Sequence, residues 1–232
     1  MPRPQSGFTL IEIAIVLVII GLLLGGVLKG QELINSAKIK NVANDLNGIS
    51  AAVYGYQDRY KTYPGDDSGA SVRWTATPAV ANGDKGGTVT GEFCAGASDA
   101  VEAIYFWRHL RLAGFVAGDA STGEQPQNAL GGIVGVQTST GANTGGGTGT
   151  AVPELGGLVV CTTNLNGKIA GAIDQQFDDG KPGSGTMRGY TQNKVPVTRG
   201  CSSNVTRATN VLNTVGYNAG DDSELYTICK SI

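Results

Sequence analysis

Charged residues are scarce in this sequence, and the basic ones form no cluster. Asp, Glu, Lys and Arg together make up 16% of the 232 residues, the formal net charge is −2, and the sequence pI is about 5.4. Because binding to nucleic-acid phosphates relies on a concentrated positive surface, this composition predicts no nucleic-acid partner. A chain of this length accommodates one medium-sized domain and an additional element, but not two full domains.

Closely spaced metal ligands are also absent. The sequence has one histidine, His109, and four cysteines, none of them in a Cys-x-x-Cys or Cys-x-x-His pair. Since structural zinc sites use such closely spaced ligands, the cysteines indicate two disulfides formed in an oxidising compartment. Sequence spacing permits three connectivities for the four cysteines, which are Cys94, Cys161, Cys201 and Cys229.

Motifs that would indicate an enzyme are missing. Glycine is abundant, with 36 residues, but the sequence has no Gly-x-x-x-x-Gly-Lys-Ser/Thr phosphate-binding loop and no Gly-x-Ser-x-Gly nucleophile elbow. Catalytic triads and metal-hydrolase sites usually rely on histidine, and this sequence has only one. The sequence therefore predicts a protein that is not an enzyme.

What the sequence does have is a long apolar run at its N-terminus. Residues 8–28 contain one charged residue, Glu12, and as a helix these 21 residues would extend about 30 Å, the thickness of a bilayer's hydrocarbon core. A secretory signal would have a shorter apolar stretch followed by a small-x-small cleavage site. A plain membrane anchor explains the length but not Glu12, because an acid in such a segment costs about 2.5–3.5 kcal/mol and usually marks a function.

The residues at the start of this run suggest a third interpretation. Residues 6–12 read SGFTLIE, and this segment resembles the cleavage and methylation motif of type IV prepilins and type II secretion pseudopilins. The resemblance implies that a prepilin peptidase cuts between Gly7 and Phe8 and methylates the new Phe8 amine. It also implies that Glu12 pairs with the terminal amine of a neighbouring subunit in a filament, which supplies the counter-charge that an acid in an apolar setting needs.

This resemblance leads us to expect a structural subunit that polymerises through its N-terminal helix into a type IV pilus-like filament, and the loop-rich head would suit a minor pilin. A pseudopilin of a type II secretion system is the alternative that shares the same N-terminus. An alternative of another class is a membrane-anchored binding module or adhesin that does not polymerise. Glu12 argues against that last alternative, because a solitary anchor has no use for the acid.

The resemblance also implies partners and a location. The implied partners are other copies of the chain, related pilins, the prepilin peptidase and the inner-membrane assembly platform. The implied location is the bacterial inner membrane before assembly, and afterwards a pilus at the cell surface or a periplasmic pseudopilus.

The chain divides into four predicted parts. Residues 1–7 are the cleaved leader, residues 8–30 the transmembrane or filament-core helix, residues 31–62 the amphipathic half of the same helix, and residues 63–232 a globular head. In the second half of the helix, apolar residues recur at steps of three and four, which predicts one buried stripe. The stripe consists of Ile39, Val42, Leu46, Ile49, Val53, Tyr56 and Tyr60. Pro64 and Gly65 then end the helix.

The head has the pattern of an α+β domain, in which a small antiparallel sheet packs on the long N-terminal helix as in pilins. A helix is predicted over residues 98–113, with Asp99 and Glu102 at the spacing of a capping box, and a second over 169–177. Asn166 and Gly167 form a turn signal. Strands are predicted at residues 133–137, 158–162, 187–190 and 225–228, and a Gly-rich loop near 139–150.

Few polar residues in the head are candidates for a site. Asp174, Asp178 and Asp179 precede a glycine and would suit calcium, but the EF-hand spacing is missing, so we expect no metal and no cofactor. The acidic pairs at 66–67 and 221–222 are expected to be solvated turns. His109 lies beside two arginines and is expected at the surface.

The resemblance bears on the cysteines as well. Pilins have a disulfide near the C-terminus that encloses a surface loop, so the resemblance implies a bond between Cys201 and Cys229. Cys94 and Cys161 would then form the remaining pair.

Overall fold

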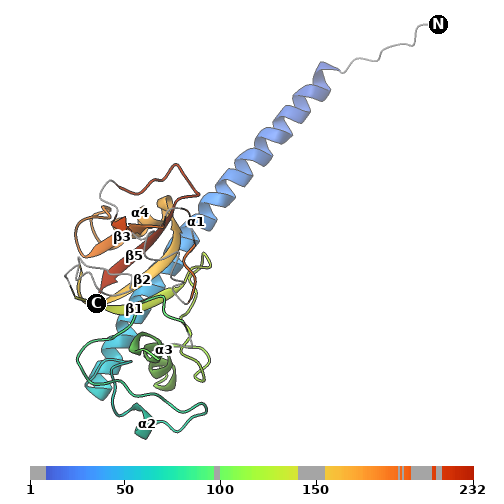
Figure 1. Ribbon diagram of the computed structural model, residues 1–232. Coiled ribbons are helices and arrows are strands. Elements are labelled where there is room, and N and C mark those ends of the chain that lie inside the picture. Colours follow the sequence, from blue (N-terminus) through green and yellow to red (C-terminus); the bar gives the residue numbers. More distant parts are fainter. Residues whose placement is uncertain are drawn as a thin grey trace. The chain divides into compact units, whose positions relative to one another are not determined.

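The computed structural model describes residues 9–96, 100–140, 155–192, 194, 196–199, 211–212 and 216–232 (Figure 1). The helices are α1 (Leu10–Tyr60), α2 (Ala70–Arg73), α3 (Glu102–Leu112) and α4 (Gly167–Phe177), and the strands are β1 (Val134–Thr140), β2 (Gly156–Asn166), β3 (Met187–Thr191), β4 (Val211–Leu212) and β5 (Leu225–Ser231). The chain divides into two compact units, Met1–Lys38 and Ile39–Ile232. The predicted α+β class is confirmed.

The first unit contains the N-terminal part of α1. Its large apolar side chains, from Leu10 to Ile34, are between 46% and 87% exposed. A helix that is apolar around its whole circumference requires apolar surroundings, either lipid or other helices. Among the described residues, α1 is the one helix long and apolar enough to cross a membrane, judged by length and composition.

The second unit is built on an antiparallel sheet with the strand order β1-β2-β5-β3-β4. Strand β2 pairs with both β1 and β5, and its register shifts between Thr162 and Leu165, where Asn164 has a φ of 60°. Such a bulge changes which face each side chain points to. Leu158, Val160 and Leu165 therefore all reach the same apolar cluster although their numbers differ in parity.

One face of the sheet forms the main core with the second half of α1. The predicted stripe is confirmed: Val42, Leu46 and Val53 are at most 1% exposed. Side chains from α3, α4 and the sheet complete this cluster, and Figure 1 shows α3 beyond the β1 edge and α4 beside β3. The helix ends at Tyr60, four residues before Pro64, and Lys61 follows in a left-handed conformation with a φ of 57°.

The opposite face of the sheet carries a smaller cluster that contains three of the four cysteines, Cys94, Cys161 and Cys229. Cys161 and Cys229 lie directly opposite each other on β2 and β5 and form a disulfide. The implied pairing of Cys201 with Cys229 is therefore wrong, because strand pairing places Cys161 next to Cys229. Cys94 is also disulfide-bonded, and Cys201 lies outside the described residues.

The other predicted helices and strands are present, but α3 and α4 begin at Glu102 and Gly167 instead of at residues 98 and 169. Helix α3 begins at Glu102 with Val101 as its N-cap, so the predicted capping box is wrong; Ser98 and Asp99 lie outside the described residues. Asn166 is the N-cap of α4, where its side chain accepts a hydrogen bond from the Ile169 N–H at 3.0 Å.

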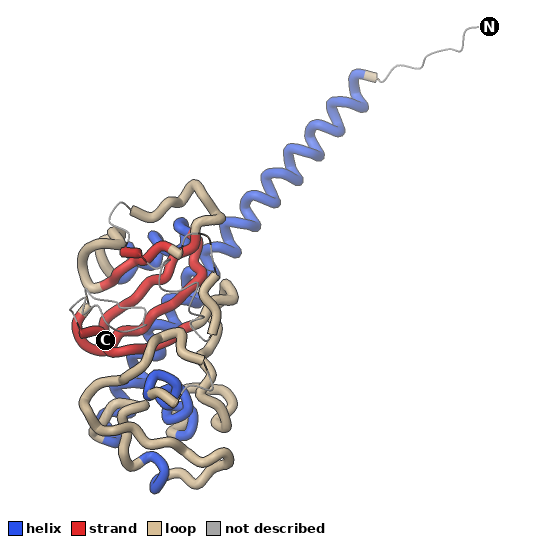
Figure 2. The backbone as a smooth tube through the Cα atoms, viewed as in Figure 1, coloured by secondary structure: helices blue, strands red, loops and turns tan. Residues whose placement is uncertain are grey.

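Much of the second unit is loop. Figure 2 shows that the chain between α1 and β1 is mostly irregular. Most of the predicted Gly-rich loop, residues 141–150, lies outside the described residues, and the two residues before it belong to β1.

Candidate functional site

The first turn of α1 holds the one acid of the apolar segment in a defined arrangement. The Glu12 carboxylate accepts hydrogen bonds from the Thr9 N–H at 2.9 Å and from the Thr9 hydroxyl at 2.8 Å. The Glu12 N–H in turn donates to the Thr9 hydroxyl oxygen at 3.4 Å. This reciprocal pattern is a capping box, which satisfies N–H groups that a helix start leaves without partners. Thr9 was not among the predicted site residues, although the spacing Thr-x-x-Glu is the sequence signal for this arrangement.

The capping box uses only one of the two carboxylate oxygens of Glu12. Both bonds from Thr9 go to Oε2 of Glu12, and Oε1 accepts no hydrogen bond from the residues that the structure describes. The next charged residues along α1, Lys29 and Glu32, are paired with each other at 2.7 Å. Glu12 is the one charged residue of the apolar run and has no ion pair within the part of the chain that the structure describes, so one of its oxygens is available to a donor. Gly7 and Phe8, the predicted cleavage site, lie outside the described residues.

His109 is buried, so its predicted position at the surface is wrong. Its Nδ1 accepts a hydrogen bond from the Gly65 N–H at 3.0 Å, and its Nε2 lies 2.9 Å from the Ala81 carbonyl oxygen. The side chain is 0% exposed, and this burial lowers the pKa of His109 below its ordinary value. The ring is therefore a neutral link between α3 and two loops.

Asp67 is also buried, at 2% exposure, and not solvated as predicted. It accepts hydrogen bonds from the Tyr56 hydroxyl at 2.6 Å and from the Gly69 N–H at 2.8 Å, and it forms an ion pair with Arg73. Burial acts to raise the pKa of Asp67, but these donors, above all Arg73, outweigh it and lower the pKa. The carboxylate joins the end of α1 to the turn that follows.

Asp66, Asp84 and Glu102 form an acidic group in which carboxylate oxygens of the three residues lie within 4.8 Å of one another. Asp66 is 1% exposed and accepts hydrogen bonds from two backbone N–H groups, those of Gly86 and Gly87. Glu102 accepts from the backbone N–H groups of residues 84 and 90. Burial raises the pKa of Asp66. These carboxylates organise the loop between them, and the predicted surface position of Asp66 is wrong.

The acidic group at the end of α4 is the predicted calcium candidate. Asp174, Asp178 and Asp179 bring their oxygens within 4.8 Å of one another. The Tyr217 hydroxyl donates to Asp174 at 2.6 Å, and backbone N–H groups donate to all three carboxylates. Burial raises the pKa of Asp174. An all-oxygen set suits calcium, but the donors already account for the closeness of these acids. By contrast, Asp221 lies at the surface, where it pairs with Lys194 at 2.8 Å.

Comparison with known proteins bears on the N-terminus. Residues 2–28 match the family model described as the prokaryotic N-terminal methylation motif, the signature of type IV prepilins and pseudopilins. That family is a structural type and not an enzyme family. No curated protein matches the chain.

Proposed function

We propose, from the premise that residues 2–28 form a prokaryotic N-terminal methylation motif, that this chain is a pilin-like subunit of a type IV pilus-like filament. The observation that carries the proposal is the position of Glu12, which is the one charged residue of the exposed apolar segment, has no ion pair among the described residues, and follows the Gly7-Phe8 cleavage motif. A structural subunit of this kind is not an enzyme and needs no cofactor.

Processing is the first step of the proposed function. A prepilin peptidase would cut between Gly7 and Phe8 and methylate the Phe8 amine. Because the cut precedes the apolar run, the run stays in the mature protein as residues 8–30, followed by an amphipathic half at 31–62 and a head at 63–232. Before assembly this helix would hold the subunit in the inner membrane.

Assembly is the second step. Copies would leave the membrane through the assembly platform and bundle their apolar helices away from water, which offsets the exposure of so many apolar side chains. In such a bundle an unpaired carboxylate is costly. Oε1 of Glu12 can accept from the Phe8 amine of an adjacent copy while Thr9 keeps Oε2. This pairing would also fix the axial register of neighbouring copies.

The experiment that tests this function is electron microscopy of filaments sheared from cells, with mass spectrometry of their subunits. We expect peptides from the head, residues 63–232, in the sheared surface fraction, and their loss from it when the gene is deleted. If instead the protein stays in the membrane fraction of cells that make filaments, it is an anchored module and not a filament subunit. Recovery only from a periplasmic filament would indicate the pseudopilin.

A further inference from the structure

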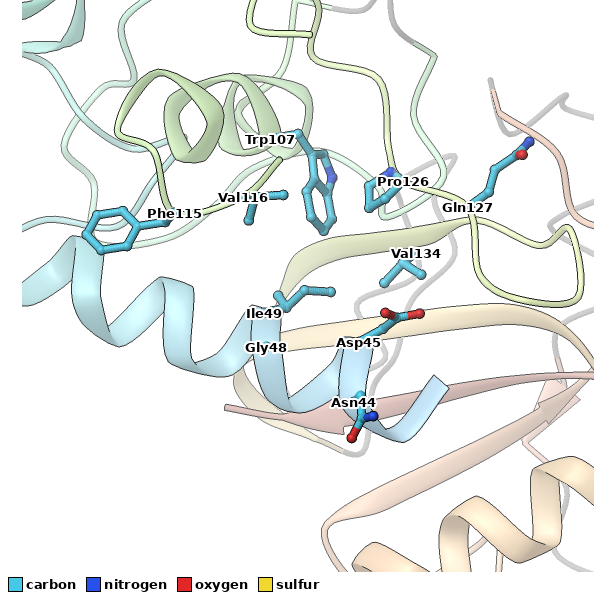
Figure 3. Close-up of a pocket in the computed structure, with 10 residues that line it drawn as sticks. All are labelled: Asn44, Asp45, Gly48, Ile49, Trp107, Phe115, Val116, Pro126, Gln127 and Val134. Carbon is cyan, nitrogen blue, oxygen red and sulfur yellow. The ribbon is translucent and has the colours of Figure 1, made fainter. Parts of the chain in front are cut away.

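A groove on the head lies beside α1 and is separate from the N-terminal motif. Its volume is about 250 Å³, and its walls are largely apolar and aromatic, with Ile49 of α1, Trp107 of α3, Phe115, Val116, Pro126 and Val134 among them (Figure 3). Typical small-molecule sites measure about 300–1,000 Å³. The groove is smaller than such sites, and its size suits a single side chain.

Asp45 gives this groove its charge. It lines the groove from α1, and Figure 3 shows its carboxylate on the side of Val134 while Asn44 points away. Asp45 has no hydrogen bond or ion pair among the residues that the structure describes. Loss of hydration raises the pKa of Asp45, and no cation among the described residues offsets this effect.

The chemistry of the groove selects its occupant. Apolar walls suit an aliphatic stem, and a carboxylate at the edge suits a cation at the end of that stem; a lysine side chain combines the two. We propose that this groove receives the Lys40 side chain of a second copy of the chain, with its ammonium group on Asp45. The inference rests on the proposed function, since it concerns a contact between copies in the filament.

Two observations favour a second copy and Lys40 as the occupant. A filament requires heterologous contacts, in which one patch of a copy fits a different patch of the next, and a groove that receives a lysine from outside its own lining is of this kind. Lys40 lies on α1, is exposed, and has no ion pair among the described residues. Lys40 precedes Asp45 by five positions, so a neighbour shifted by about 7.5 Å along α1 brings the two to one level.

Gly48 keeps the groove accessible from the side of α1. A Cβ added at Gly48 would meet no atom within 4 Å, so a larger side chain fits there without disturbing the fold. Leucine at this position would project into open space that the incoming lysine needs. Since glycine is a poor helix former, the replacement should not weaken α1.

The direct test is carbodiimide cross-linking of sheared filaments. The reagent activates a carboxylate, and an amine in contact displaces it to form an amide with net loss of water. We expect peptide mapping to find Asp45 joined to Lys40 of another copy. Filaments that show other cross-links but none at Asp45, or Asp45 joined to another protein or another lysine, would overturn the inference. If no filaments contain the chain, the proposed function fails together with it.

Exchanging the two charges by mutation tests the same contact without a cross-linking reagent. Asp45→Lys and Lys40→Asp should each lower the ratio of filament to membrane protein about tenfold, and the double variant should restore it. Gly48→Leu should lower the ratio similarly. The matched controls are Asp58→Lys, an exposed acid of α1 outside the groove, and Ala51→Leu. Failure of the double variant to recover, while it folds and is processed, would contradict the pairing.

Discussion

Glu12 has one role that the structure shows and a second that the proposed function assigns to it. It completes a capping box with Thr9, and under the proposed function it also pairs with the amine of an adjacent copy. The capping role concerns one subunit and the pairing role concerns two. A variant that loses the carboxylate should therefore affect assembly far more than insertion into the membrane.

We expect Glu12→Ala to leave expression, membrane insertion and cleavage near normal while blocking incorporation into filaments. Glu12→Gln keeps the shape but loses the charge, and should be intermediate or equally defective. The measurement is the ratio of sheared filament protein to membrane protein. Glu32→Ala, which removes an exposed acid of the same helix, is the control. A wild-type ratio for Glu12→Ala would show that the acid sets no register between copies.

His109 shows what local sequence does not reveal. Flanked by two arginines, it has the sequence context of a surface residue, yet contacts to Gly65 and Ala81, distant in sequence, bury it. Asp66 and Asp67 likewise look like a solvated turn, and only the folded loop supplies their N–H donors. These contacts depend on how segments meet in space, which periodicity does not encode.

The buried His109 predicts a pH dependence of stability. Because its folded pKa lies below the ordinary value of about 6.5, the unfolded state binds the proton first as the pH falls. The contribution of His109 to the free energy of unfolding should thus be fully present well above pH 6.5 and be lost as the pH falls through this value, by at most about 1.4 kcal/mol per pH unit. The negative charge of Asp67 raises the pKa of His109, whereas the positive charges of Arg108 and Arg73 lower it.

Chemical denaturation of the full chain in detergent between pH 5 and 8 measures this effect. His109→Gln should be less stable at pH 8 and should lack this component of the slope. An identical slope in the wild type and in this variant would show that other groups cause the pH dependence.

At the scale of elements, α1 was the most predictable. Its stripe of apolar residues is local and periodic, and the structure buries that stripe as expected. The starts of β3 and β5 also match the predicted positions. The pairing of β2 with β5 could not be predicted, since it joins segments about sixty residues apart and contains a bulge. The error in the disulfide assignment follows from that unpredicted pairing.

Leu46 tests the packing of α1 on the sheet. It is 1% exposed in the main core, so Leu46→Ala should lower the free energy of unfolding by about 2–5 kcal/mol through lost burial and a residual cavity. Tyr54→Ala on the same helix is the control, because Tyr54 is 58% exposed and its loss should cost little. Urea denaturation gives both values. Equal effects would mean that this side of α1 is not the packed side.

The disulfides give the corresponding test for the sheet. Peptide mapping without reduction should find Cys161 joined to Cys229, and Cys94 joined to Cys201, the one cysteine that remains in the sequence. In the chain-entropy model a bond spanning 68 residues stabilises the head by about 4 kcal/mol, so replacing Cys161 and Cys229 by serine should lower stability markedly. Cys201 joined to Cys229 would contradict the strand pairing.

At the scale of the whole molecule, the function depends on a short segment. The motif and its apolar run could be read from about thirty residues, because cleavage and membrane insertion depend on local sequence. The groove at Asp45 could not, since α1, α3, β1 and the chain between α3 and β1 form it together. The proposed contact of the head therefore depends on tertiary structure, whereas the proposed processing depends on the local sequence at the N-terminus.

The intact mass of the protein recovered from the sheared filament fraction tests the proposed processing and assembly together. We expect a chain that begins at Phe8, carries one added methyl group, and has the mass of a form with two disulfides, four hydrogens lighter than the reduced form. Replacing Gly7 by a bulky residue should leave the leader attached and empty the filament fraction. A filament subunit that begins at Met1, or at any residue after 28, would contradict the account.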